Sequence, residues 1–208
     1  MATKLYVVTG DQYRIIDRRI REIKRQLDQD NGSPLDPDAV ADALQEIVEG
    51  RFGGQSGFLR LLSEEPLVLE PTDGSQVLAE ANKVFAYIDP DFQNWNADEA
   101  GLATEQAQVC VYEMVRDATF AQMFGSLASD AAKLCLTQAQ IKQFVVKHRD
   151  QLRSDGYATF FLFKSHDHFF VARVGVASDG LGVHVYRFEN SFVWFAGGRH
   201  RVVVPQLA

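Results

Sequence analysis

Four of the five histidines lie in the last fifty residues, where metal binding is the first chemistry to consider. His166 and His168 are separated by one residue, and His184 and His200 follow; imidazole is a common zinc ligand. However, the first two fall where a hairpin turn is predicted, and polar residues are expected in such turns. His200 lies between two arginines, whose charge repels a metal cation. The sequence therefore predicts no metal site.

Arginine and aromatic residues in the same region favour a binding surface. The residues expected to form it are Arg173, Arg187, Trp194, Arg199 and Arg201. Exposed aromatic rings beside guanidinium groups suit a peptide, a partner protein or single-stranded nucleic acid. The alternative is a sheet covered on both faces, which would bury most of the aromatic rings. Periodicity alone does not decide between the two.

The N-terminal segment has the strand, helix, turn and helix order of a ribbon-helix-helix DNA-binding module. Its candidate nucleic-acid contacts are Lys4, Tyr6, Arg14, Arg18 and Arg21. Three features count against this hypothesis: Val8 is a poor reader of bases, the first helix is long, and the second is acidic. The alternative is a helical hairpin that docks on the rest of the chain or on a second copy of itself.

Other polar clusters have plainer explanations. The oxygen-rich segment 89–99 lacks the glycine and the terminal glutamate of an EF-hand loop, so we expect a solvated acidic loop. Cys110 and Cys135 have apolar neighbours and form no CxxC pair, which indicates reduced core thiols. No phosphate loop, dinucleotide fingerprint or GxSxG elbow occurs, and His148 lies on the apolar side of its helix. We therefore expect no cofactor and no catalytic residue.

The N-terminal part is expected to be a separate module, residues 1–49. A strand at 3–9 precedes a helix from Asp11 whose apolar residues recur at steps of three and four. Asp36 and Pro37 begin the second helix. Four glycines in residues 50–57 then predict a flexible linker.

Residues 58–208 are expected to form an α+β domain that ends in a five-stranded antiparallel meander. Strands are predicted at 66–69, 84–88 and 108–114, with helices at 75–83 and 118–124. Thr137 and Gln140 have the spacing of a capping box at the start of a further helix. The meander strands are predicted at 157–164, 169–177, 182–188, 192–196 and 199–204. Their short connections require antiparallel neighbours.

The charge distribution and the hydropathy limit the classes of partner that the chain can bind. The net charge is −7, but residues 26–130 carry twenty acidic and four basic residues, so the middle of the chain should not approach a nucleic-acid backbone. No apolar run would span a bilayer, and the first residues are unlike a secretory signal. We expect a cytoplasmic protein with no membrane partner.

Several strings are distinctive, among them QYRIIDRRIREIKRQLDQ, ATFAQMFGSL and RHRVVVPQL. On these strings the chain resembles a group of hypothetical proteins from the genomes of uncultured small-genome bacteria. The resemblance covers most of the chain and implies a separable module at the front. It implies no activity and no site residue.

The sequence as a whole favours a non-catalytic binding or protein-interaction protein, with a protein partner or a homodimer. DNA binding through the front module is the first alternative. An enzyme whose site is assembled from distant residues is the second.

Overall fold

The computed structural model describes residues 8–29, 32–48, 57–63 and 65–207, and only the backbone of residues 39, 42 and 46. The chain divides into two compact units, Met1–Gly54 and Gln55–Ala208. The predicted linker, 50–57, lies outside the described residues except for Gly57.

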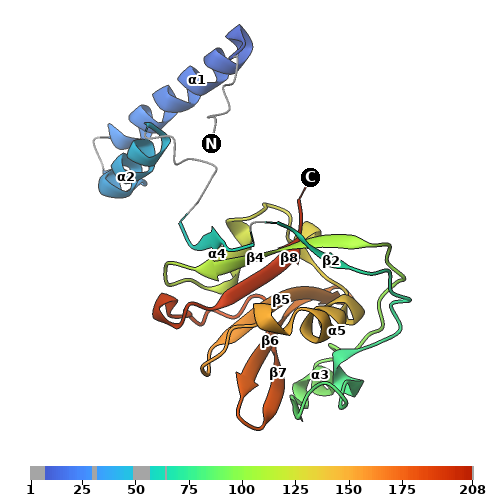
Figure 1. Cartoon of the computed structure of the whole chain (residues 1–208). Helices are drawn as coiled ribbons and strands as arrows, with labels where there is room; N and C mark the ends of the chain where they lie inside the picture. Colours follow the sequence, from blue (N-terminus) through green and yellow to red (C-terminus); the bar gives the residue numbers. More distant parts are fainter. Residues whose placement is uncertain (1–7, 30–31, 49–56, 64, 208) are drawn as a thin grey trace. The chain divides into compact units, whose positions relative to one another are not determined.

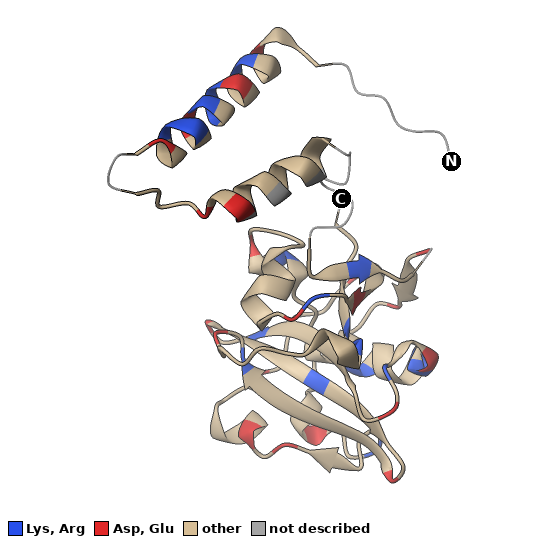
Figure 2. Cartoon of the chain, turned by 90° about the vertical axis from the view of Figure 1, so that its left-hand side faces the viewer, with Lys and Arg blue, Asp and Glu red and all other residues tan. Residues whose placement is uncertain are grey.

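The first unit contains two helices, α1 (Gly10–Leu27) and α2 (Pro37–Val48) (Figure 1). Thr9 caps α1 in a reciprocal capping box with Gln12, so Thr9 begins the helix and is not part of a strand. Val8 is described and is not in a strand, and residues 3–7 of the predicted strand, with Lys4 and Tyr6, lie outside the described residues. Asp36 accepts a hydrogen bond from the amide of Asp38 at the start of α2. Basic and acidic residues alternate along α1 (Figure 2).

The second unit is built on one mixed sheet. Its strands are β1 (Leu59–Leu61), β2 (Leu67–Leu69), β3 (Tyr87–Ile88), β4 (Ala107–Met114), β5 (Ala158–Ser165), β6 (His168–Ala177), β7 (Gly180–Arg187) and β8 (Arg201–Pro205). The strand order is β1-β4-β8-β5-β6-β7-β3, and β2 also pairs with β4. The fold is therefore α+β, as expected from the sequence. Of the predicted meander, β5, β6 and β7 are confirmed as successive antiparallel strands.

The last two meander strands were predicted wrongly. Residues 192–196 form no strand, because Trp194 makes only an isolated bridge to Ala118 and inserts its ring into the core. β8 is a strand, but it lies between β4 and β5 and runs parallel to β5. The long connection after β7 allows this placement, because it crosses the sheet before the chain returns at β8.

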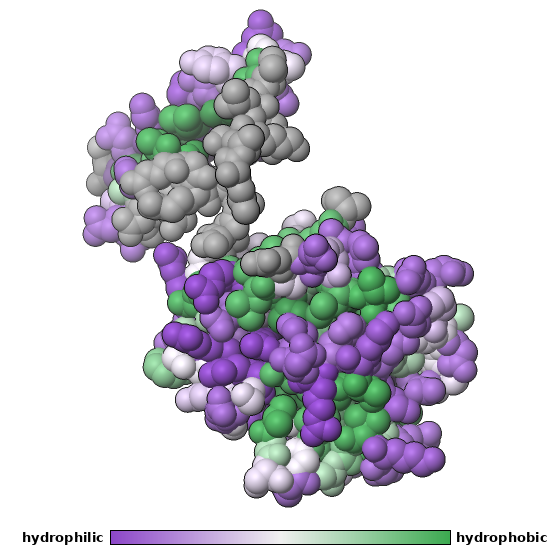
Figure 3. All heavy atoms as spheres, viewed as in Figure 1, coloured by the Kyte–Doolittle hydropathy of each residue, from purple (hydrophilic) through white to green (hydrophobic). Residues whose placement is uncertain are grey.

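Both faces of the sheet are covered. The first face packs on α5 (Gln138–Lys147), α3 (Asp91–Asn94) and the 3-10 helix η1 (Leu78–Glu80). The second packs on α4 (Phe120–Gly125), the 3-10 helix η2 (Ala131–Leu134) and the Trp194 segment. Short 3-10 turns also occur at η3 (Arg149–Gln151) and η4 (Ala196–Gly198). Most of the aromatic rings are buried by this arrangement, so the predicted surface keeps only part of them. On the side seen in Figure 3, apolar residues lie between hydrophilic ones.

The segment before β4 is less regular than its sequence predicts. The predicted helix at 75–83 is reduced to η1, and the predicted strand at 84–88 to the two residues of β3. β3 is nevertheless important, because it pairs in parallel with β7 and brings Tyr87 beside that strand. No helix among the described residues has the length and the apolar character needed to cross a bilayer.

Candidate functional site

A row of polar and aromatic side chains lies on the second face of the sheet, beside the part that the Trp194 segment covers. We name it the Arg173 site. Its members are Tyr87, Asp89, Tyr157, Arg173, His184, Trp194 and His200. They come from β3, β6, β7 and the segments that precede β5 and β8, so the sheet register sets their positions.

Arg173 is at the centre of the site. It is paired with His184 on β7 and with Phe160 on β5. Because side chains alternate along a strand, Arg173 shares the face of Val171, which belongs to the second core. Arg173 is half-buried, and its guanidinium makes no ion pair or side-chain hydrogen bond with any residue that the structure describes. A half-buried cation without a carboxylate partner is unusual in a unit with eighteen acidic and thirteen basic residues.

The surface next to Arg173 has small residues. Ala158, Gly175 and Gly182 pair across three strands, and the row ends at Tyr87. One guanidinium nitrogen of Arg173 lies 3.9 Å from the position that a Cβ on Gly175 would take. Ala158 is fully buried, so the sheet backbone is partly open only at Gly175 and Gly182, which are half-buried.

His184 forms one end of the site. Its Nδ1 lies 3.3 Å from the Asp89 carboxylate, and the ring centre of Tyr87 lies 4.9 Å from its own. This contact orients the ring and leaves Nε2 as the atom that can bind a ligand. Asp89 reaches His184 because β3 pairs with β7, and Asp89 continues this pairing by donating its amide to the carbonyl of Val183.

His200 forms the other end. It is 7% exposed, and its Nδ1 accepts a hydrogen bond of 3.1 Å from the amide of Ala158. Burial, followed by the charge of Arg173 and a smaller effect of Arg153, lowers the pKa of His200 to about 4, although the Ala158 hydrogen bond acts in the opposite direction. The ring is therefore neutral at pH 7. Because Nδ1 is an acceptor, Nε2 carries the proton and is a donor.

The ring of Trp194 covers the part of the site next to His200. Its ring contacts Phe160 at 4.7 Å, Phe192 at 5.0 Å and His200 at 5.4 Å between centres. The indole Nε1 is buried and has no acceptor among the described residues. Around it, Phe192 and Tyr157 are 58% and 38% exposed and form an aromatic rim.

The geometry of the site suits binding better than acid-base catalysis by its two imidazoles. The sheet order places β6 and β5 between β7, which carries His184, and β8, which follows His200. Three strand spacings of about 4.8 Å separate the backbones of β7 and β8 by about 14 Å. No hydrogen bond or ring contact joins His184 and His200 among the described residues. The described residues also contain no group of three or more potential metal ligands.

The two cysteines are poor nucleophiles. Both are half-buried free thiols. Burial raises the pKa of Cys135 to about 12 and also raises that of Cys110. Neither is a thiolate at neutral pH, and a thiol that stays protonated does not attack a substrate.

The structure brings together only part of the predicted binding surface. Arg173 and Trp194 lie together, and Arg199 is exposed in the adjoining turn, with a left-handed φ of 47°. Arg187 and Arg201 lie on the opposite face. Arg187 is 5.4 Å from the ring centre of Trp95, and Arg201 donates to the carbonyls of Asp150 and Leu152. The prediction of one surface with five members is therefore wrong.

A cavity of about 370 Å³ lies at the turn between β5 and β6, apart from the Arg173 site. His166 and His168 line it together with Trp95 and Arg187. The Glu99 carboxylate binds both the ring and the amide of His166. Two of the histidines considered as metal ligands are therefore close together, but one is held by a carboxylate, and the described part of the chain contains no group of three ligands.

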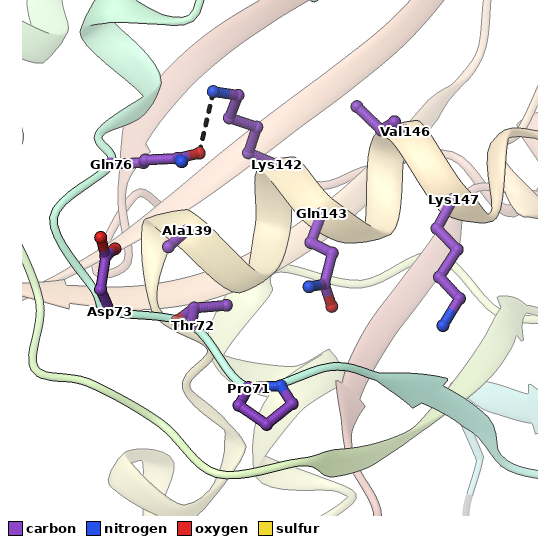
Figure 4. Close-up of a pocket in the computed structure, with 9 residues that line it drawn as sticks. All are labelled: Pro71, Thr72, Asp73, Gln76, Ala139, Lys142, Gln143, Val146 and Lys147. Atoms are coloured by element: carbon purple, nitrogen blue, oxygen red, sulfur yellow. Dashed lines mark hydrogen bonds between the residues drawn. The ribbon is translucent and has the colours of Figure 1, made fainter.

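A groove of about 460 Å³ runs between α5 and residues 71–76 (Figure 4). Lys142 extends across it and donates to Gln76, while Lys147 pairs with Glu70 at its end. Gln143 points toward Pro71, and its amide oxygen is buried without a donor among the described residues. Both cations of this groove already have partners, so it is a weaker anion site than Arg173.

The arginines predicted to contact nucleic acid lie along α1. Arg14 pairs with Asp11 and Arg21 with Asp17, whereas Arg18 has no ion pair among the described residues. Two of the three guanidinium groups are thus already neutralised by acidic residues of the same helix.

Comparisons of the chain with protein-family models, curated proteins and solved structures give no match. The ligand of the Arg173 site therefore has to be inferred from the residues of the site alone. Sequence reasoning missed Tyr87 and Asp89 because their position depends on the pairing of β3 with β7. The neighbours Arg173 and His184 could have been found from the two-residue turn at Ser178 and Asp179, since that turn sets the register of the hairpin.

Proposed function

We propose that the second unit is a non-catalytic binding module, and that the Arg173 site recognises an acidic segment of a partner protein. The observation that carries this proposal is the guanidinium of the half-buried Arg173, which has no carboxylate partner among the described residues. A ligand carboxylate would supply the partner, and a guanidinium group binds carboxylates in a two-pronged geometry.

The surroundings of Arg173 support a peptide ligand. His184 and His200 place a ring nitrogen on either side of the guanidinium, and the protonated Nε2 of His200 is a donor. Tyr157 and Phe192 offer partly exposed rings, which are favoured residues in protein interfaces. Gly175 and Gly182 are only half-buried, so the sheet carries no side chain at these two positions beside Arg173, where an extended backbone could approach it.

Single-stranded nucleic acid is the competing ligand, because it also uses arginine and aromatic rings. The charge of the second unit favours the peptide. Thirteen basic and eighteen acidic residues give this unit a net negative charge, which repels a long polyanion more than a short acidic segment.

The experiment compares two arginine variants of the full chain. A fluorescein-labelled peptide of alternating glutamate and leucine is titrated with the protein, and anisotropy is recorded. Arg173→Gln should weaken binding about tenfold or more, since a charge-assisted contact of about 1.4 kcal/mol is lost. Arg187→Gln is the matched control on the opposite face and should bind like the original protein. Equal affinity for both variants, no binding, or preferential binding of a labelled oligothymidylate would overturn the proposal.

A further inference from the structure

The apolar stripe of α1 is uncovered in the first unit. Tyr13, Ile16 and Ile20 are 69%, 52% and 39% exposed, and no residue of α1 is buried. Toward the end of the helix, Ile23 and Leu27 are half-buried. In α2, Ile47 and Val48 are also exposed, so the apolar residues of the two helices are covered only in part.

The spacing of this stripe indicates what covers it. Tyr13, Ile16, Ile20, Ile23 and Leu27 follow one another at steps of three, four, three and four residues. This is the seven-residue repeat of a coiled-coil seam, in which the stripe of one helix packs against the equivalent stripe of another. The narrow seam of a coiled coil fits a partner helix better than it fits the face of a sheet.

Some charged residues of α1 are paired within the helix and others are not. Arg14 and Arg25 on the outer side, and Asp17 beside the seam, pair with residues of the same helix. Arg19 and Lys24, which lie beside the seam, make no ion pair with any residue that the structure describes. Asp17 and Lys24 are seven residues apart and therefore flank the seam on the same side.

These charges select the direction of the partner helix. In a parallel pair of α1 helices, Arg19 of one copy would lie near Lys24 of the other, and like charges would repel. In an antiparallel pair with Ile20 packed against Ile23 of the second copy, Asp17 lies opposite Lys24 of the second copy. By symmetry this contact occurs twice.

We infer that the chain forms a homodimer in which the α1 stripes of two copies pack antiparallel, with Asp17 of each copy against Lys24 of the other. This inference concerns the first unit and does not depend on the Arg173 site.

Sedimentation velocity of the full chain over a range of concentrations tests the dimer. The original protein should pass from monomer to dimer as its concentration rises. Asp17→Lys and Lys24→Asp should each weaken the association about tenfold or more, and the double variant, which exchanges both charges, should restore it. Ile20→Asp should leave the chain monomeric.

Glu22→Lys is the matched control, because Glu22 also forms an ion pair within α1 but lies away from the seam. It should dimerise like the original protein, and circular dichroism should show that every variant keeps its helix content. A monomer at all concentrations would overturn the inference. So would a dimer that Ile20→Asp or the single charge reversals leave unchanged.

Discussion

Arg173 and His184 lie opposite each other on β6 and β7, yet only His184 has a carboxylate partner. Asp89 binds the imidazole at 3.3 Å, while the neighbouring guanidinium has no ion pair among the described residues. The sheet thus holds side by side an imidazole that has a carboxylate partner and a guanidinium that has none among the described residues. This difference is the basis of the proposed binding site.

The charge of Arg173 acts on His200. Burial is the largest cause of the lowered pKa of His200, and Arg173 is the next. Arg173→Gln should therefore raise the pKa of His200, because a repulsive positive charge is removed. A titration of the histidine ring signals by NMR measures this value. Arg187→Gln should leave it unchanged, and a similar rise in both variants would show that Arg173 is not close to the ring.

His200 should make stability depend on pH. Its pKa in the folded protein is about 4, below the ordinary value of 6.5, so the unfolded chain binds its proton more readily. The contribution of neutral His200 is complete above about pH 6.5 and falls as the pH drops toward about 4. The free energy of unfolding should decrease by about 2 kcal/mol from this residue between about pH 7 and about pH 5.

Urea unfolding at several pH values measures this change. His200→Gln should show a flatter pH dependence over the same range, although it is less stable at pH 7, as expected for a lost buried contact. An unchanged slope in this variant would mean that His200 does not titrate with the lowered pKa.

Gly198 should not tolerate a side chain. A Cβ at this position would lie 2.6 Å from the Tyr157 ring and 2.8 Å from Nε2 of His200. Gly198→Ala should lower the free energy of unfolding by about 1–3 kcal/mol, because the buried His200 ring has to shift. Gly125→Ala is the matched control: Gly125 ends α4, has nothing within 4 Å of its Cβ position, and should be neutral or slightly stabilising. Equal midpoints in thermal unfolding would contradict this packing.

Trp194 should contribute through its ring and not through its N–H group. Trp194→Ala removes contacts with Phe160 and His200 and should cost about 3–5 kcal/mol. Trp194→Phe should cost much less, because Nε1 has no acceptor among the described residues and no hydrogen bond is lost with it. Chemical unfolding of both variants gives the two values, and equal losses would point to an unrecognised partner of the N–H group.

Local signals in the sequence predicted many elements of the fold. The capping box of Thr137 and Gln140 marks the start of α5, and alternation together with short turns gives β5, β6 and β7. In these cases residues close together in the sequence determine the local structure, so the helix and the strands can be predicted from the sequence.

Long-range pairing could not be predicted in the same way. The strand β8 has the expected residues, but its insertion between β4 and β5 depends on contacts far apart in the chain. The segment around Trp194 alternates like a strand, yet burial of the indole in the second core determines its path. The same limit applies to the site, because Asp89 reaches His184 only through the pairing of β3 with β7.

The two tryptophans provide the most direct test of the proposed binding site. Trp194 borders the Arg173 site, whereas Trp95 lies under Arg187 on the opposite face of the sheet, so each face has its own indole signal. The glutamate and leucine peptide is added to ¹⁵N-labelled full chain, and the two indole signals are followed by NMR. The signal of Trp194 should move with increasing peptide while that of Trp95 stays in place. Movement of the Trp95 signal alone, or of neither signal at millimolar peptide, would contradict the assignment of the binding site to Arg173.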